Sequence, residues 1–97
     1  MVSNKPVGID AESIRQFSPE LAAATMKPEE LDIIQSSPNP SIAFTHFWTM
    51  KESLLKLTGE GITDNIQGIL TNADHYHFIT QVYENKGYVL TWVEEKI

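Results

Sequence analysis

The chain contains no cysteine, which excludes a disulfide framework, a zinc-finger cage and a thiol nucleophile. It also lacks long apolar segments: its uncharged apolar runs span only a handful of residues, whereas a membrane-spanning helix needs about 20. No N-terminal stretch combines a basic flank with an apolar run, as a secretory signal does. We therefore expect a cytoplasmic protein with no contact to the membrane.

Basic residues are scarce as well. Seven Lys and Arg stand against thirteen Asp and Glu, a net charge of -6 that disfavours non-specific attraction to nucleic acid. The charge does not exclude a phosphate-bearing ligand, because a divalent cation held by carboxylates can bridge two anions.

With 97 residues, 41% of them hydrophobic, the chain has the size and composition of one globular domain covering residues 1–97.

Hydrophobic spacing and turn residues predict a small set of elements along the chain. In order, these are a strand at 6–12, a helix that starts at Ser18 and stops before Pro28, a short helix from 29 to about 35, a long helix from about 41 to 58, and a hairpin of strands 77–83 and 88–93. Glycine, asparagine and aspartate break residues 61–76 into pieces with no clear element. The pattern predicts an α+β fold, in which a long helix and two short helices pack on one face of a small, mainly antiparallel sheet.

The long helix carries a pair of opposite charges. Glu52 and Lys56 are four residues apart with the acid first, so they lie on the same side of the helix and can pair. Taken alone, such a pair is typical of any solvent-exposed helix and contributes about 0.3–0.5 kcal/mol.

Two further acids in the first strand can lie near this pair. Asp10 and Glu12 are two residues apart in the first strand, so they project from the same face of it. If that strand lies beside the long helix, both meet Glu52. Three hard oxygen donors, with water and phosphate filling the remaining positions, are what magnesium prefers. A lysine one turn further on, Lys56, is then placed to meet a phosphate oxygen.

These residues resemble the signature of the 4'-phosphopantetheinyl transferases. Residues 47–56 (FWTMKESLLK), followed by 59–62 (GEGI), are similar to the family's aromatic-Lys-Glu-Ser/Ala-x-x-Lys and Gly-x-Gly motif. Upstream, residues 8–12 (GIDAE) look like its companion motif Gly-Ile-Asp-x-Glu. The two motifs stand in the family's order, some forty residues apart, and the resemblance extends from the first strand to the terminal hairpin.

The resemblance implies a 4'-phosphopantetheinyl transferase-like fold and a magnesium-dependent activity. Family members move the phosphopantetheine arm of coenzyme A onto a serine of an acyl or peptidyl carrier protein, releasing adenosine 3',5'-bisphosphate. By similarity, Asp10, Glu12 and Glu52 hold the magnesium ion, Glu52 helps remove the serine proton, and Lys56 neutralises the leaving phosphate. Lys51 is a candidate for binding a coenzyme A phosphate, with an ordinary solvated lysine as the alternative.

Two alternatives remain open at this stage. Larger, surfactin-activating members of the family are tandems of two similar halves, and this chain resembles the second half. Smaller members, of the holo-acyl-carrier-protein synthase type, have about this length and self-associate, so we expect either a homo-oligomer or part of a longer protein. The apolar and aromatic residues of the last two strands are a candidate assembly surface, and packing beneath the helices is the alternative; they are Tyr83, Tyr88, Val89, Leu90 and Trp92. Carrier proteins are acidic, so the negative charge of this chain disfavours its encounter with them. A non-catalytic domain that binds coenzyme A or a carrier is therefore the alternative function.

Overall fold

A computed structural model describes residues 6–59, 66–71 and 73–96 of the chain. The elements, in chain order, are β1 (Val7–Ser13), α1 (Pro19–Thr25), α2 (Pro28–Ser36), α3 (Pro40–Thr58), the 3-10 turns η1 (Ile66–Gly68) and η2 (Ala73–His75), β2 (Tyr76–Tyr83), the 3-10 turn η3 (Glu84–Lys86) and β3 (Tyr88–Glu95). The predicted α+β class, three helices and terminal hairpin are confirmed, with boundaries that differ by one or two residues.

The helix ends follow from residues that are visible in the sequence. Ser18 caps α1 by accepting a hydrogen bond from the backbone N–H of Leu21, and Asn39 caps α3 in the same way through Ile42. All three helices begin with proline, whose missing N–H would have no partner in the first turn. Gly59 ends α3 at φ 76°, a left-handed conformation that glycine adopts without steric penalty.

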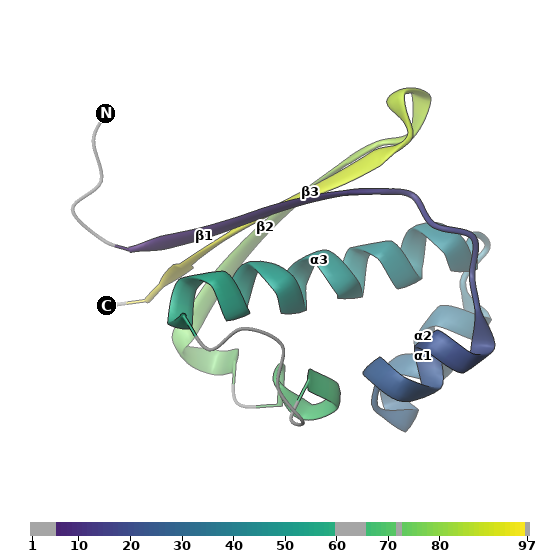
Figure 1. Ribbon diagram of the computed structural model, residues 1–97, viewed down its shortest axis with the longest axis horizontal. Helices are drawn as coiled ribbons and strands as arrows, with labels where there is room; N and C mark the ends of the chain where they lie inside the picture. Colours follow the sequence, from purple (N-terminus) through teal and green to yellow (C-terminus); the bar gives the residue numbers. More distant parts are fainter. Residues whose placement is uncertain (1–5, 60–65, 72, 97) are drawn as a thin grey trace.

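The sheet has the strand order β1-β3-β2, with β3 paired antiparallel to both neighbours. The long helix α3 runs along one face of this sheet, and α1 and α2 lie on the other side of α3 (Figure 1). The two short helices therefore pack against α3 rather than on the sheet. Their core consists of Ala22, Met26, Ile34 and Phe44, all buried.

A chain of threonine hydroxyls links α3 to the sheet. Thr49 on α3 donates to the carbonyl of His46 and lies 2.8 Å from the hydroxyl of Thr91 on β3, which is 2.9 Å from that of Thr80 on β2. Because the carbonyl can only accept, the proton of Thr49 is already used, so Thr91 donates to Thr49 and Thr80 donates to Thr91. Thr49 and Thr91 are fully buried, and this directed chain fixes the helix against the middle strand.

The opposite face of the sheet presents apolar side chains to solvent. Ile9 of β1, Trp92 of β3 and Ile79 of β2 lie side by side across the three strands. Their exposed fractions are 54%, 39% and 40%, which is high for large apolar residues in one row. Within the described ranges, no helix is long and apolar enough to cross a membrane.

Candidate functional site

The site begins where β1 crosses α3. A methyl group added at Gly8 would overlap the carbonyl oxygen of Ser53 and lie 3.0 Å from Cβ of Leu57. Glycine is therefore required by the close approach of strand to helix, and not by an unusual backbone angle. The same approach brings Asp10, two residues further along β1, against the face of α3 that carries Glu52 and Lys56.

Asp10 is the buried centre of the site. Its side chain is only 4% exposed, and its Oδ1 accepts a hydrogen bond of 2.7 Å from the ammonium of Lys56. The second oxygen, Oδ2, is buried and has no hydrogen-bond partner. An unpaired carboxylate oxygen inside a protein is unfavourable, so Oδ2 marks a position where a cation or donor would be stabilised.

Glu12 and Glu52 lie within the electrostatic reach of Asp10. Burial raises the pKa of Glu12, and the nearby charge of Asp10 raises it further, whereas the guanidinium of Arg15, 3.3 Å from Glu12 Oε1, opposes the shift. Burial also raises the pKa of Glu52, helped by the charge of Asp10 and opposed by Lys56 and Arg15. Asp10 therefore disfavours the ionised form of both glutamates, which places the three acids in one cluster.

Lys56 completes the cluster with positive charge. Its hydrogen bond to Asp10 raises the pKa of the ammonium above its usual value, and the charges of Asp10, Glu52 and Glu12 act in the same direction. The sequence expectation that Asp10, Glu12, Glu52 and Lys56 share one region agrees with this geometry. A second cation, Arg15, joins them through Glu12, and the sequence reasoning did not single it out.

The donor set suits a hard divalent cation, but the side chains are not arranged as a finished cage. Among the described residues, no three acidic or imidazole side chains stand close enough to hold a metal ion as they are oriented. The donors are carboxylate oxygens, the type that magnesium prefers, and the orphaned Oδ2 of Asp10 offers a ready ligand. Glu12 and Glu52 would need to turn toward it, so a magnesium site at Asp10, Glu12 and Glu52 stays a prediction.

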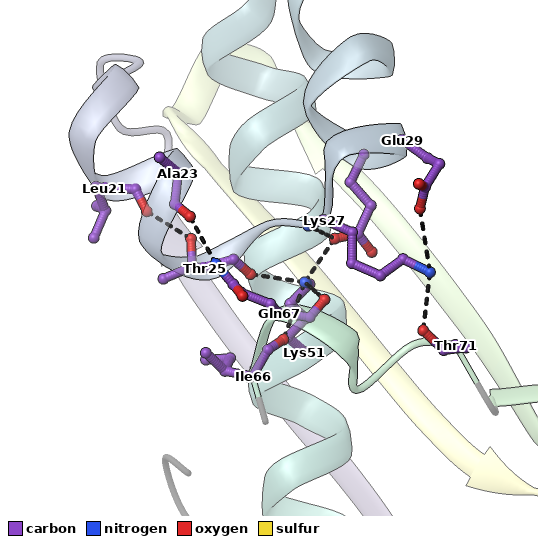
Figure 2. A network of polar contacts seen from close by, with 10 residues as sticks. Leu21, Ala23, Thr25, Lys27, Glu29, Lys51, Ile66, Gln67 and Thr71 are labelled. Carbon is purple, nitrogen blue, oxygen red and sulfur yellow. Dashed lines mark hydrogen bonds and ion pairs between the residues drawn. The ribbon is translucent and has the colours of Figure 1, made fainter. Parts of the chain in front are cut away.

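Lys51 lies outside this cluster. Its ammonium is completely buried and donates to Glu30 Oε1 at 2.7 Å and to the carbonyls of Thr25, Gln67 and Ile66 at 2.8, 2.9 and 3.1 Å (Figure 2). Burial lowers the pKa of Lys51, against the opposing effect of the Glu30 carboxylate.

The expectation that Lys51 binds a coenzyme A phosphate therefore disagrees with this geometry, because its donors are used to join α1, α2 and η1 to α3. The same Glu30 oxygen also accepts the backbone N–H of Lys27 at 2.8 Å and so caps α2. Glu30 was missed in the sequence, where its only signal was its place two residues after Pro28, the first residue of α2.

Part of the motif at residues 47–62 cannot be compared with the structure. Of the Gly-x-Gly segment only Gly59 is described, and residues 60–62 lie outside the described ranges. Trp48, inside the same motif, stacks on Phe44 with ring centroids 6.4 Å apart, and the guanidinium of Arg15 lies 5.8 Å from the centre of the Trp48 ring. This aromatic residue supports the packing of α3 and holds Arg15 near the acids.

The fold is a small α+β domain in which Asp10, Glu12, Glu52 and Lys56 gather where β1 crosses α3. The sequence profile of the 4'-phosphopantetheinyl transferase superfamily matches residues 6–96, so the chain belongs to this superfamily.

Several relatives agree with this assignment over part of their length. The chain is 38% identical over 64 residues to the 4'-phosphopantetheinyl transferase psf-1 of Bacillus pumilus, a match covering 64% of this chain and 28% of that protein. It is 33% identical over 64 residues to the 4'-phosphopantetheinyl transferase of Bacillus subtilis, covering 64% and 29%. The chain therefore spans less than a third of the length of these relatives.

A solved structure confirms the fold. The holo-[acyl-carrier-protein] synthase of Thermotoga maritima superimposes with a TM-score of 0.71 at 14% sequence identity, covering 95% of this chain and 64% of that one. At this identity the likeness establishes the fold alone.

Proposed function

We propose that this chain carries the metal- and phosphate-binding part of a magnesium-dependent 4'-phosphopantetheinyl transferase acting on an apo carrier protein, with coenzyme A as co-substrate. The observation that carries the proposal is the buried Asp10, paired with Lys56 on one oxygen and orphaned on the other. Membership in the superfamily supports the reaction class, because the relatives that this chain matches are named 4'-phosphopantetheinyl transferases.

In this proposal, Asp10, Glu12 and Glu52 hold the magnesium ion. A cation bound there would neutralise charge on the coenzyme A pyrophosphate and polarise the phosphorus under attack. Glu52 accepts the proton of the incoming serine hydroxyl, directly or through a water molecule. The serine oxygen forms the new bond to phosphorus as the bond to adenosine 3',5'-bisphosphate breaks, and Lys56 neutralises the departing phosphate.

The activity is tested by incubating the chain with coenzyme A, Mg²⁺ and an apo carrier protein and measuring the mass gained by the carrier. We expect Glu52→Gln and Lys56→Ala to reduce the rate by about 100-fold or more. Glu95→Gln and Lys86→Ala, both exposed and outside the site, are matched controls that keep the parent rate. Parent-like rates in the first two variants would refute the assigned roles, and coenzyme A binding without transfer would favour a non-catalytic binding domain.

We also propose that the active form is a homo-oligomer joined through the outer face of the sheet. The row of Ile9, Trp92 and Ile79 supports this proposal, because large apolar side chains in adjacent positions favour burial against another surface.

Sedimentation tests this assembly. Ile79→Lys is expected to shift the chain toward monomer, whereas Ile33→Lys, a control at an apolar position of α2 that is 58% exposed, is not. A parent chain that sediments as a monomer at tens of micromolar would contradict the proposal.

A further inference from the structure

The two lysines of the α3 motif differ in how firmly they are held. Lys51 is enclosed and donates to four oxygens, whereas the Lys56 side chain is 54% exposed. Within the described ranges, Lys56 has a single hydrogen bond, the one to Asp10 Oδ1. Lys56 can therefore move into solvent after losing one contact, and water can replace that contact.

Asp10 has no such freedom. It lies within β1, between residues that pair with β3, and its side chain is 4% exposed. A buried carboxylate is stabilised by a neighbouring cation, and Lys56 is the cation in contact with Asp10. Whatever binds Oδ2 must do so next to an ammonium that already holds Oδ1.

We infer that Lys56 is the resident counter-ion of Asp10 in the metal-free chain, and that a divalent cation entering at Oδ2 displaces it from the carboxylate. This inference rests on the metal assignment in the proposed function and adds an order of events to it. A divalent cation supplies twice the charge of an ammonium to the acid cluster, and Lys56 has an open path to solvent. Once released, the Lys56 ammonium is free to meet a phosphate oxygen.

The exchange has a thermodynamic consequence. If the metal binds best when Lys56 is away from Asp10, the apparent metal affinity equals the intrinsic affinity multiplied by the fraction of molecules in which the pair is broken. The smaller that fraction is, the weaker the observed binding. Removing the ammonium should therefore strengthen metal binding, although the same ammonium is proposed to assist the reaction. A lysine that acts only on the phosphate would leave metal affinity unchanged.

The first test is the binding of Mn²⁺ to the whole chain without coenzyme A, followed through the electron paramagnetic resonance signal of free Mn²⁺. We expect Lys56→Met to bind about fivefold more tightly than the parent chain, the effect of losing one partly exposed ion pair. Lys56→Gln serves as a second variant in case the methionine perturbs folding. Lys86→Met, at an exposed position of η3, is the control for a general change of charge and should match the parent.

The second test separates displacement from repulsion at a distance. In a chain labelled at lysine Nζ, Mg²⁺ should move the Lys56 resonance toward that of a free ammonium and leave the Lys51 and Lys86 resonances in place. Tighter binding by Lys56→Met without this movement would refute displacement. Equal binding by parent and variants would overturn the inference alone, whereas no binding by any of them would overturn the metal assignment as well.

Discussion

The buried contact between Lys51 and Glu30 allows a quantitative prediction about stability. We consider Lys51→Met, which keeps the length of the side chain and removes its charge. The change leaves the Glu30 carboxylate buried without its cation and takes a donor away from three backbone carbonyls. In the folded chain these groups are enclosed among α1, α2, α3 and η1, where water does not easily replace the lost donor.

The magnitude follows from the loss of one partner of a buried pair. Breaking such a pair lowers the free energy of unfolding by about 3–5 kcal/mol, because an uncompensated charge remains inside. Part of that loss should return in the double variant Glu30→Gln/Lys51→Met, in which no buried charge is left. Since a domain of this kind has a total stability of about 5–15 kcal/mol, the single variant lies near the limit of folding.

Urea unfolding followed by circular dichroism is the assay. With a slope of about 1–3 kcal/mol per molar urea, we expect the midpoint of Lys51→Met to fall by about 1 M or more. The exposed Lys86→Met should unfold like the parent and serves as the control. A loss below about 1 kcal/mol, together with a raised KM for coenzyme A, would refute the structural role and restore Lys51 as a phosphate-binding residue.

Three further predictions concern the packing of α3. Gly8→Ala should lower the free energy of unfolding by about 3 kcal/mol, because the new methyl group overlaps the Ser53 carbonyl; urea unfolding measures it, and Ala11→Gly on the exposed face is the contrasting change. Thr91→Val should lose about 1–2 kcal/mol in the same assay by interrupting the hydroxyl chain. Burial lowers the pKa of His46 below 6.5, so between its folded and unfolded pKa values the folded chain binds fewer protons than the unfolded chain. The free energy of unfolding should therefore fall as the pH drops through that window, and His46→Gln should remove this part of the pH dependence.

The fold was predictable from the sequence because its boundaries are local. Proline and a capping side chain start α1 and α3, glycine ends α3, and Gly87 at φ 78° closes the turn of the hairpin. Each signal acts within a few residues, where backbone geometry decides the outcome. The arrangement of layers was less accessible, because whether α1 and α2 touch the sheet or only α3 depends on packing between distant segments.

The grouping of the acids with Lys56 was predictable from the sequence, whereas the surroundings of Lys51 were not. Spacing places Glu52 and Lys56 on one face of a helix, and the strand period does the same for Asp10 and Glu12. Nothing local indicates that Lys51 meets Glu30, which is 21 residues away and on another helix. That contact exists only because α2 packs against α3, so reading the motif as a row of ligand-binding residues misassigned one of them.

The helix itself explains why two lysines of one motif have such different surroundings. Positions on an α-helix are separated by about 100° each, so Lys56 lies only about 40° from Glu52 around the axis, whereas Lys51 is about 140° from Lys56. Since α3 lies between the sheet and the two short helices, these directions lead to opposite layers (Figure 1). Lys56 and Glu52 face the crossing with β1 that Gly8 permits, and Lys51 faces α1 and α2. One lysine therefore holds the helix in place, and the other lies at the acids, where we propose that it exchanges partners.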